Sequence, residues 1–233
     1  MIFAAGLGTR LKPFTDHHPK ALAPVHGKSL LQHNIQYLQR FGIFEVVVNV
    51  HHFAEQIETE LSQHNGFGST VHISDERAAV LETGGGLLHA ASFFNEEHFL
   101  VMNVDMLTNM NVQRLIDAHL ASKALASLAV MRRASSRQLL FDHEMQLCAW
   151  RNRTDDAMKI ARPYEDCQEY AFSGIQMLHT DFFKYNLYTG KFSIIDAYLQ
   201  LAKDHAIKGF DHTGDLILDV GKPESLEKAA QLF

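Results

Sequence analysis

The stretch that decides the fold runs from MIFAAGLGTR (residues 1–10) to HHPKALAPV (residues 17–25). Its first four residues are apolar and are typical of a buried strand, and a loop with two glycines and an arginine follows. A glycine-rich loop after a strand favours phosphate binding, because backbone N–H groups can approach an anion where no side chain intervenes. The stretch therefore predicts an anion site at the end of the first strand.

Strand-like and helical patterns alternate along the rest of the chain, which is typical of an α/β domain built on a mostly parallel sheet flanked by helices. Residues 30–41 have helical spacing between Ser29 and Gly42, and EVVVNV (45–50) is a buried strand. Residues 138–152, QLLFDHEMQLCAWRN, predict a small β-hairpin or lid insertion. No repeat or long linker interrupts the chain, so we expect a single domain over 1–233. Further helices are expected at 53–64, 86–94, 112–123, 194–205 and 224–232, and further strands at 71–74, 99–105, 125–131, 170–179 and 216–220.

Composition excludes several classes of protein. The 233 residues are 46% hydrophobic and carry a formal net charge of −6, with no basic stripe for a nucleic acid. No apolar run is long enough to span a bilayer, and no signal peptide is evident, so we expect no membrane partner. Cys148 and Cys167 are too far apart for a zinc ribbon, and a reduced, cytoplasmic location fits them. Because the chain opens within a strand, we expect a few residues to precede it.

The glycine loop does not match the common nucleotide fingerprints. Gly6 and Gly8 lack the third glycine of the dinucleotide motif, and no Gly-Lys-Ser/Thr follows as in a P-loop. Pro13, Pro19 and Pro24 prevent a long helix from starting at Gly8, so we expect an extended, wrapped loop. Taken alone, the loop leaves phosphate binding and an ordinary surface loop equally open.

The wider stretch GLGTRLKPFTDHHPKALAPVHGKSLLQH (6–33) resembles the signature of the sugar-1-phosphate nucleotidyltransferases. It carries G-x-G-T-R, L-x-P-x-T, P-K and P-V-x-G-K in order. The resemblance implies a Rossmann-like, GT-A-like fold and transfer of a nucleoside monophosphate from a triphosphate to a sugar 1-phosphate. It also implies that the loop cradles the triphosphate and that Lys20 faces the reacting phosphates. The nucleotide-binding residues implied here are Ala5, Gly6, Gly8, Thr9 and Arg10.

The chemistry of that reaction supports catalytic roles for two cations. A sugar-phosphate oxygen attacking the α-phosphorus brings two anions together, so the site must neutralise and align charge. Lys20, held after Pro19, would bridge the sugar phosphate and the α-phosphate, while Arg10 would hold the departing pyrophosphate through its two-pronged guanidinium. Both residues are therefore expected to be catalytic, with Lys20 also binding substrate.

Two aspartates are expected to bind Mg²⁺. Asp105 and Asp219 each end an apolar strand, and a parallel sheet presents its ligands at the carboxyl ends of its strands. Mg²⁺ prefers such oxygen ligands and completes its shell with water and phosphates. The resemblance assigns this pair to the metal, with Asp105 catalytic and Asp219 also near the substrate. Where the family commonly has Gly-Asp, this chain has Val104-Asp105, and the valine narrows the space beside the metal.

Two further glycine segments are expected to meet the base and the sugar. LETGGGLLHA (81–90) places three glycines before an expected helix, where a flat base can lie against backbone. Resemblance assigns Gly84 and Gly85 to the nucleotide and Glu82 to the substrate. FSGIQMLH (172–179) resembles the strand whose glycine, here Gly174, passes close to the sugar ring. The family's Glu-Lys-Pro before that strand is missing, and Arg162 or Glu165 would stand in for it.

The sequence thus predicts an enzyme with a nucleoside triphosphate and a sugar 1-phosphate as partners. The E-T-G-G-G form favours uridylyl transfer to N-acetylmuramic acid 1-phosphate, with mannose- or heptose-1-phosphate guanylyl transfer as the alternative. Activation of a non-sugar group and a non-catalytic nucleotide-binding protein on the same scaffold also stay open. At this chain length we expect no room for the added acyltransferase domain that some bifunctional members of the resembled family carry, so one activity is expected. A homodimer is compatible with these observations.

Overall fold

The computed structural model describes residues 1–185 and 188–233. The chain divides into two compact units, the first formed by 1–93, 102–109 and 216–233 and the second by 94–101 and 110–215. Strand β6 (His98–Asn103) therefore contributes its beginning to the second unit and its end to the first. The prediction of a single nucleotidyltransferase domain over 1–233 stays a prediction.

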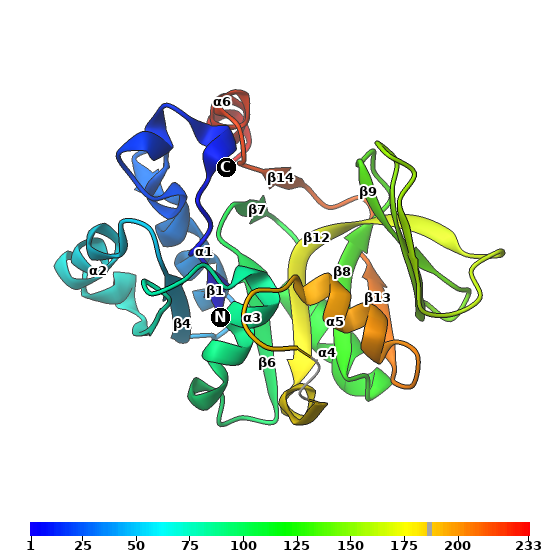
Figure 1. Cartoon of the computed structure of the whole chain (residues 1–233). Coiled ribbons are helices and arrows are strands. Elements are labelled where there is room, and N and C mark those ends of the chain that lie inside the picture. The colour runs from blue at the N-terminus through cyan, green and yellow to red at the C-terminus, as the bar shows by residue number, and fades with distance from the viewer. Residues whose placement is uncertain (186–187) are drawn as a thin grey trace. The chain divides into compact units, whose positions relative to one another are not determined.

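The first unit contains a parallel sheet built as the hydrophobic pattern predicts. Strand β1 (Ile2–Phe3) pairs in parallel with β4 (Glu45–Val50) and with the end of β6, and β4 pairs in parallel with β5 (Thr70–Asp75). Ile2, Val48 and Val50 are completely buried, as expected for strands covered on both faces. Figure 1 shows helices around these strands: α1 (Leu30–Gln39), α2 (Ala54–Gln63) and α3 (Glu82–His89).

Helix α1 begins where the sequence predicts, because the Ser29 side chain accepts a hydrogen bond from the Gln32 backbone N–H and caps the helix. Helix α3 begins four residues before the expected start, so the three glycines lie inside it rather than ahead of it. Residues 9–22 form three short 3₁₀ turns rather than a fully extended loop. Two hairpin strands then follow, β2 (Pro24–Val25) and β3 (Lys28–Ser29).

A small two-stranded sheet completes the first unit. It pairs β7 (Met106–Thr108) with β14 (Ile217–Asp219), strands separated by more than a hundred residues of sequence. Asp219 lies opposite Met106 in this antiparallel register. Helix α6 (Pro223–Leu232) follows β14 and begins with a proline in its first turn, a position that proline favours. Short 3₁₀ turns cover Asn65–Gly68 and Ala91–Phe93.

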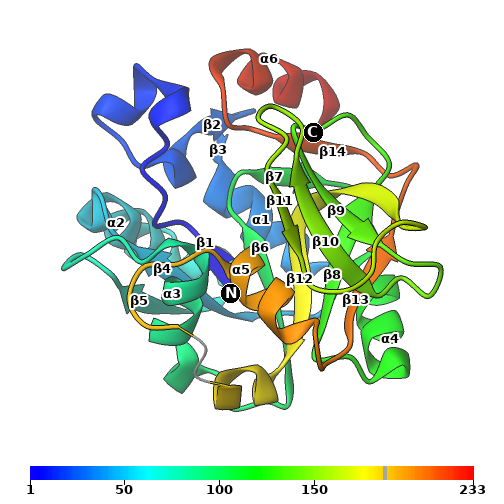
Figure 2. The same cartoon turned by 45° about the vertical axis from the view of Figure 1, so that its right-hand side comes forward.

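The second unit is mainly antiparallel. Its long strand β12 (Gln168–His179) pairs with β8 (Ala126–Met131) on one side and with β9 (Arg137–Phe141) on the other, and β13 (Ile207–Asp211) joins β8 in parallel. The predicted hairpin insertion is confirmed: β9 pairs with β10 (Leu147–Asn152), and β11 (Met158–Ile160) extends it, as Figure 2 shows. The helices of this unit are α4 (Val112–Ser122), the 3₁₀ turn Thr180–Tyr185 and α5 (Ile194–Leu201).

The predicted fold class is confirmed, with a mixed, Rossmann-like α/β architecture in which a parallel sheet is flanked by helices and a β-hairpin is inserted. Within the described residues, no helix is both long enough and apolar enough to span a bilayer.

Candidate functional site

Lys20 and Asp105 form a sheltered ion pair in the first unit. Lys20 opens the 3₁₀ turn that follows Pro19, and Asp105 lies just beyond the end of β6. The Lys20 Nζ donates to Asp105 Oδ2, with 11% and 18% of the two side chains exposed. A cation and a carboxylate from residues 85 positions apart are thus brought together where water screens them little.

Arg10 and Asp219 form a second, more open pair in the same unit. Arg10 Nη2 lies 3.8 Å from Asp219 Oδ2, and the two side chains are 59% and 45% exposed. Gly221 makes this approach possible, since a Cβ there would lie 2.6 Å from Asp219 Oδ1 and 2.8 Å from Arg10 Nη2. At 3.8 Å the guanidinium retains donors for a ligand.

Backbone contacts connect the two pairs. Val220 N–H donates to the Asp105 carbonyl oxygen at 2.8 Å, and the β7–β14 register places Asp219 opposite the residue that follows Asp105. Arg10, Lys20, Asp105 and Asp219 therefore belong to one continuous part of the first unit. The β7–β14 sheet that joins them was not predicted, because three-residue strands carry almost no periodic signal.

Gly8 fixes the path of the glycine loop. Its φ is 63°, and a Cβ on it would lie 2.9 Å from Thr15 Cγ2 and 3.0 Å from Lys20 Cβ. Thr15 Oγ1 donates to the Gly8 carbonyl oxygen at 2.9 Å. Gly8 thus lets the loop pack directly against Lys20. Gly6 is different, because a Cβ there would meet no atom within 4 Å, so space beside it stays open for a ligand.

The end of β1 is held by a buried asparagine that sequence reasoning missed. Asn49 Oδ1 accepts from the backbone N–H groups of Ala4, at 2.7 Å, and Ala5, at 3.3 Å. The Ala5 N–H is therefore already hydrogen-bonded to Asn49. A nucleotide can form a backbone hydrogen bond with Ala5 through the Ala5 carbonyl oxygen. Asn49 Nδ2 in turn donates to Glu76 Oε1 at 2.7 Å.

Glu76 connects that asparagine to the glycine helix. Its side chain is 3% exposed, and burial raises the pKa of its carboxyl. A Cβ on Gly86 would lie only 2.6 Å from Glu76 Oε1 and 3.0 Å from Asn49 Nδ2, so α3 needs a glycine there. Because residue 86 is a glycine, α3 packs directly against Glu76 and Asn49, and Asn49 holds the end of β1.

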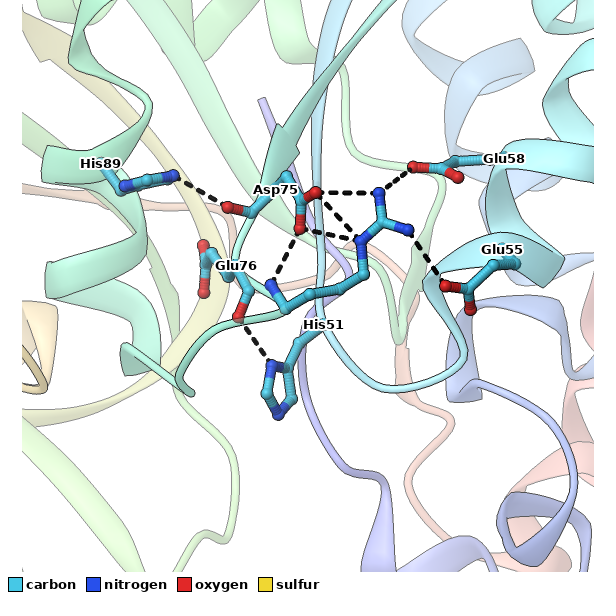
Figure 3. A network of polar contacts seen from close by, with 7 residues as sticks. His51, Glu55, Glu58, Asp75, Glu76 and His89 are labelled. Carbon is cyan, nitrogen blue, oxygen red and sulfur yellow. Dashed lines mark hydrogen bonds and ion pairs between the residues drawn. The ribbon is translucent and has the colours of Figure 1, made fainter.

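Figure 3 shows how the chain around Glu76 is anchored. His51 Nδ1 lies 2.7 Å from the Glu76 carbonyl oxygen, and His89 Nε2 lies 2.9 Å from that of Asp75. Arg77 donates to Asp75 and also reaches Glu55 and Glu58 on α2. Hydrogen bonds from Arg77 lower the pKa of Asp75, and backbone and Arg77 hydrogen bonds lower that of Glu55. The contacts of Arg77 thus tie the strand-to-loop turn to α2.

The predicted residues of the 81–90 segment lie in the first turns of α3. Glu82 is exposed and has a φ of 58°, which is unusual for a residue other than glycine. Gly84 and Gly85 are buried within the helix. Such backbone strain is found at functional sites when the surroundings enforce it. The assignment of Glu82 to the substrate and of Gly84 and Gly85 to the nucleotide stays a prediction.

Val104 lies on a well-paired stretch of backbone directly before Asp105. Its side chain is buried, its N–H donates to the Phe3 carbonyl oxygen, and its own carbonyl accepts from Asn34 Nδ2 at 2.7 Å. The strand therefore reaches Asp105 along a regular path supported by β1 and α1.

Gly174 lies in the second unit, within an irregular part of β12. Its φ is 69°, and the register of β12 against β8 shifts between Phe172 and Gln176. Glycine suits this bulge because the left-handed conformation is strained for other residues. Arg162, proposed as a sugar contact, donates instead to the carbonyl oxygens of Ala202 and Lys203 after α5.

Beside Gly174, a serine, a histidine and an aspartate are arranged like a hydrolase triad. Ser173 Oγ lies 2.7 Å from His212 Nε2, and His212 Nδ1 lies 3.4 Å from Asp215 Oδ2. Ser173 is completely buried and His212 is 2% exposed, so no substrate reaches the hydroxyl. Burial also lowers the pKa of His212. We assign this group to support of the β12 bulge.

The sequence profile of the nucleotidyl transferase family matches residues 1–233. The chain belongs to the nucleotidyl transferase family. Within this family, the chain is 41% identical over 120 residues to the N-acetylmuramate alpha-1-phosphate uridylyltransferase of Caulobacter vibrioides, covering 51% of this chain and 50% of that protein. The enzyme of the same name from Neisseria meningitidis is 39% identical over 111 residues, 48% of each chain. The matched stretch spans about half the length of these two relatives.

Solved structures show the same nucleotidyl transferase fold over nearly the whole chain. HddC from Yersinia pseudotuberculosis, complexed with GMP-PN, superposes with a TM-score of 0.78 at 22% identity and covers 99% of this chain and 96% of that one. At this identity the likeness establishes the fold.

Proposed function

We propose that this chain is a Mg²⁺-dependent sugar-1-phosphate nucleotidyltransferase that transfers a nucleoside monophosphate from a triphosphate to a sugar 1-phosphate and releases pyrophosphate. The observation that carries the proposal is the joining of the Lys20–Asp105 and Arg10–Asp219 pairs within one unit, beside the Gly6–Gly8 loop. Family membership supplies the reaction class.

The reaction needs positive charge at two places, and the two cations differ accordingly. Lys20 is a sheltered point charge fixed by Asp105, which suits it to align the sugar phosphate against the α-phosphate. Arg10 is exposed, and its planar fork suits the departing pyrophosphate, which leaves toward solvent. The open side of Gly6 gives the triphosphate access to the loop.

The donor set at Asp105 and Asp219 fits Mg²⁺, because both residues offer carboxylate oxygens and Asp219 is accessible to solvent. When bound, Mg²⁺ supplies charge neutralisation and orientation of the phosphates. Asp105 would hold the ion while also fixing Lys20, and Asp219 would hold it while also facing Arg10. The four residues would then form one catalytic unit.

The substrates proposed are UTP and N-acetylmuramic acid 1-phosphate. The support is the E-T-G-G-G segment together with the two relatives that carry that activity in their names. A guanylyltransferase acting on a manno-type sugar phosphate is the alternative, because a D-glycero-alpha-D-manno-heptose 1-phosphate guanylyltransferase from Aneurinibacillus thermoaerophilus is 30% identical over 131 residues.

A pyrophosphate-release screen tests the proposal. Each of the four common triphosphates is combined with N-acetylmuramic acid, mannose, heptose and glucose 1-phosphates, with and without Mg²⁺. We expect Mg²⁺-dependent release with UTP and N-acetylmuramic acid 1-phosphate. Release with GTP and a manno-type phosphate supports the alternative, and triphosphate binding without any release contradicts an enzymatic function.

A further inference from the structure

A cluster of histidines in the second unit has no role in the proposed reaction. Among residues 1–185 and 188–233, one group of three side chains is placed to share a metal ion: Glu97, His98 and His179, whose ligand atoms all lie within 4.8 Å of one another. His98 begins β6, Glu97 directly precedes it, and His179 ends β12.

Backbone hydrogen bonds hold these residues in place. Thr180 N–H donates to the Glu97 carbonyl oxygen at 2.9 Å, and His179 N–H donates to that of Leu125 at 3.0 Å. The side chains already approach each other, with His179 Nε2 lying 3.0 Å from Glu97 Oε1. Zinc ligands lie about 2.0–2.2 Å from the ion. Two such ligands at roughly a right angle to each other are about 3 Å apart, which is the separation found here.

A second layer supports His98. Its Nδ1 lies 3.1 Å from Nε2 of His119, whose own Nδ1 lies 2.9 Å from Ser127 Oγ. His119 is completely buried, so its two ring nitrogens face only these two partners among the described contacts. When His119 donates to Ser127, its Nε2 accepts the Nδ1 proton of His98. His98 Nε2 then keeps its lone pair for a metal, an arrangement typical of metal-binding histidines.

His179 can also present its Nε2. Without a metal its Nδ1 accepts from the Asp181 backbone N–H at 3.0 Å, so Nε2 carries the proton and donates to Glu97. On coordination that proton moves to Nδ1, and the imidazole stays neutral. Nδ1 then gives up the hydrogen bond from the Asp181 N–H. It would donate instead to Asp181 Oδ1, which lies 3.6 Å away and also pairs with Lys184 Nζ, in a carboxylate–histidine–metal arrangement.

We propose that Glu97, His98 and His179 bind a divalent transition-metal ion of the Zn²⁺ class, with water in the fourth position. Two imidazole nitrogens and one carboxylate favour such an ion over Mg²⁺, whereas the oxygen ligands of Asp105 and Asp219 favour Mg²⁺. The ion would join the start of β6 to the end of β12 and so stabilise the second unit.

The test is titration of the untagged, chelator-treated chain with Zn²⁺ alone, by calorimetry in the presence of excess Mg²⁺. Two variants, His179→Asn and Glu97→Gln, remove a ligand. The matched control is His72→Asn, because His72 Nε2 and Glu45 Oε1 lie 3.1 Å apart but, within 1–185 and 188–233, belong to no three-ligand group. Thermal unfolding of each variant without metal verifies that it folds, and the visible spectrum with Co²⁺ reports whether a thiolate ligates the ion.

We expect one equivalent of Zn²⁺ to bind the wild type and His72→Asn, with a raised Tm and no thiolate band from Co²⁺. Folded His179→Asn and Glu97→Gln should lose that equivalent or bind it at least tenfold more weakly. No saturable binding to the wild type overturns the proposal, as does equal binding to all four chains. Since these residues lie outside the proposed catalytic set, either outcome leaves the pyrophosphate-release screen unaffected.

Discussion

The two cation–carboxylate pairs of the first unit differ in exposure. Lys20 and Asp105 are in direct contact and largely shielded, whereas Arg10 and Asp219 lie 3.8 Å apart with about half of each side chain in solvent. Charges that are shielded from water interact more strongly and cost more to leave unpaired. The difference indicates that the Lys20 end is organised before a ligand arrives, while the Arg10 end has donors to spare for one.

The largest expected effect comes from removing the shielded cation. Lys20→Met should lower kcat by about 10²–10³-fold, the range observed when one group that stabilises a transition-state charge is lost. Steady-state kinetics with UTP and the sugar phosphate would measure it, with circular dichroism to verify folding. Lys28→Met is a matched control, because Lys28 is exposed and its ammonium donates to the Gln36 side chain at 2.9 Å. A folded Lys20→Met enzyme with normal kcat would contradict the contrast between the pairs.

The next effect separates two glycines of the same loop. Gly6→Ala should leave Tm unchanged, since its Cβ meets no protein atom, yet weaken triphosphate binding about tenfold, or about 1.4 kcal/mol. Gly8→Ala should lower Tm as well, because its φ is positive and its Cβ would press on Thr15 and Lys20. Calorimetric titration with UTP and thermal unfolding measure the two quantities. Equal losses of Tm in both variants would remove the distinction.

A substitution in the exposed Arg10–Asp219 pair should reduce activity less than Lys20→Met does. Arg10→Lys keeps the charge but loses the two-pronged donor, and we expect kcat/KM to fall about tenfold, as for the loss of one charged hydrogen bond. The pair is screened by solvent, so increasing ionic strength should lower the activity of the variant more than that of the wild type. A larger loss of kcat/KM in Arg10→Lys than in Lys20→Met would contradict the milder role assigned to Arg10.

The smallest effect concerns the support of the loop. Burial raises the pKa of Glu76, so its ionisation opposes folding as pH rises from the unfolded value of about 4.3 through the higher folded value. Glu76→Gln removes this pH-dependent contribution to the free energy of unfolding. As pH rises between the unfolded and folded pKa values of Glu76, the wild type should therefore lose stability relative to the variant. His51, His89, Asp75 and Arg77 lie around Glu76 and are common to both chains. Urea unfolding at several pH values measures the difference, and a constant difference would contradict the assignment.

The sequence predicts the parts of the site that lie at strand ends, because local patterns encode them. Asp105 and Asp219 each end an apolar run, and the glycine–proline loop marks itself by composition. The pairing that joins them was not predictable, since β7 and β14 are three-residue strands more than a hundred residues apart in the sequence. Asn49 was also missed, because within EVVVNV it looks like an ordinary strand residue.

The start of α3 was misplaced for a different reason. Glycine disfavours helix by about 1 kcal/mol per residue, so a run of three predicts a turn before the helix. The structure overrides that preference at Gly86, where close packing against Glu76 and Asn49 excludes any side chain. Such a contact between distant segments leaves no mark on local sequence.

The most direct test of the central claim is Mg²⁺-dependent pyrophosphate release by wild type and Asp105→Asn, measured side by side with UTP and N-acetylmuramic acid 1-phosphate. The substitution keeps the size and an acceptor for Lys20 while removing the carboxylate charge. We predict release by the wild type and at least a 10²-fold lower rate in a variant that remains folded. A folded Asp105→Asn chain that releases pyrophosphate at the wild-type rate would show that these four residues are not the catalytic unit.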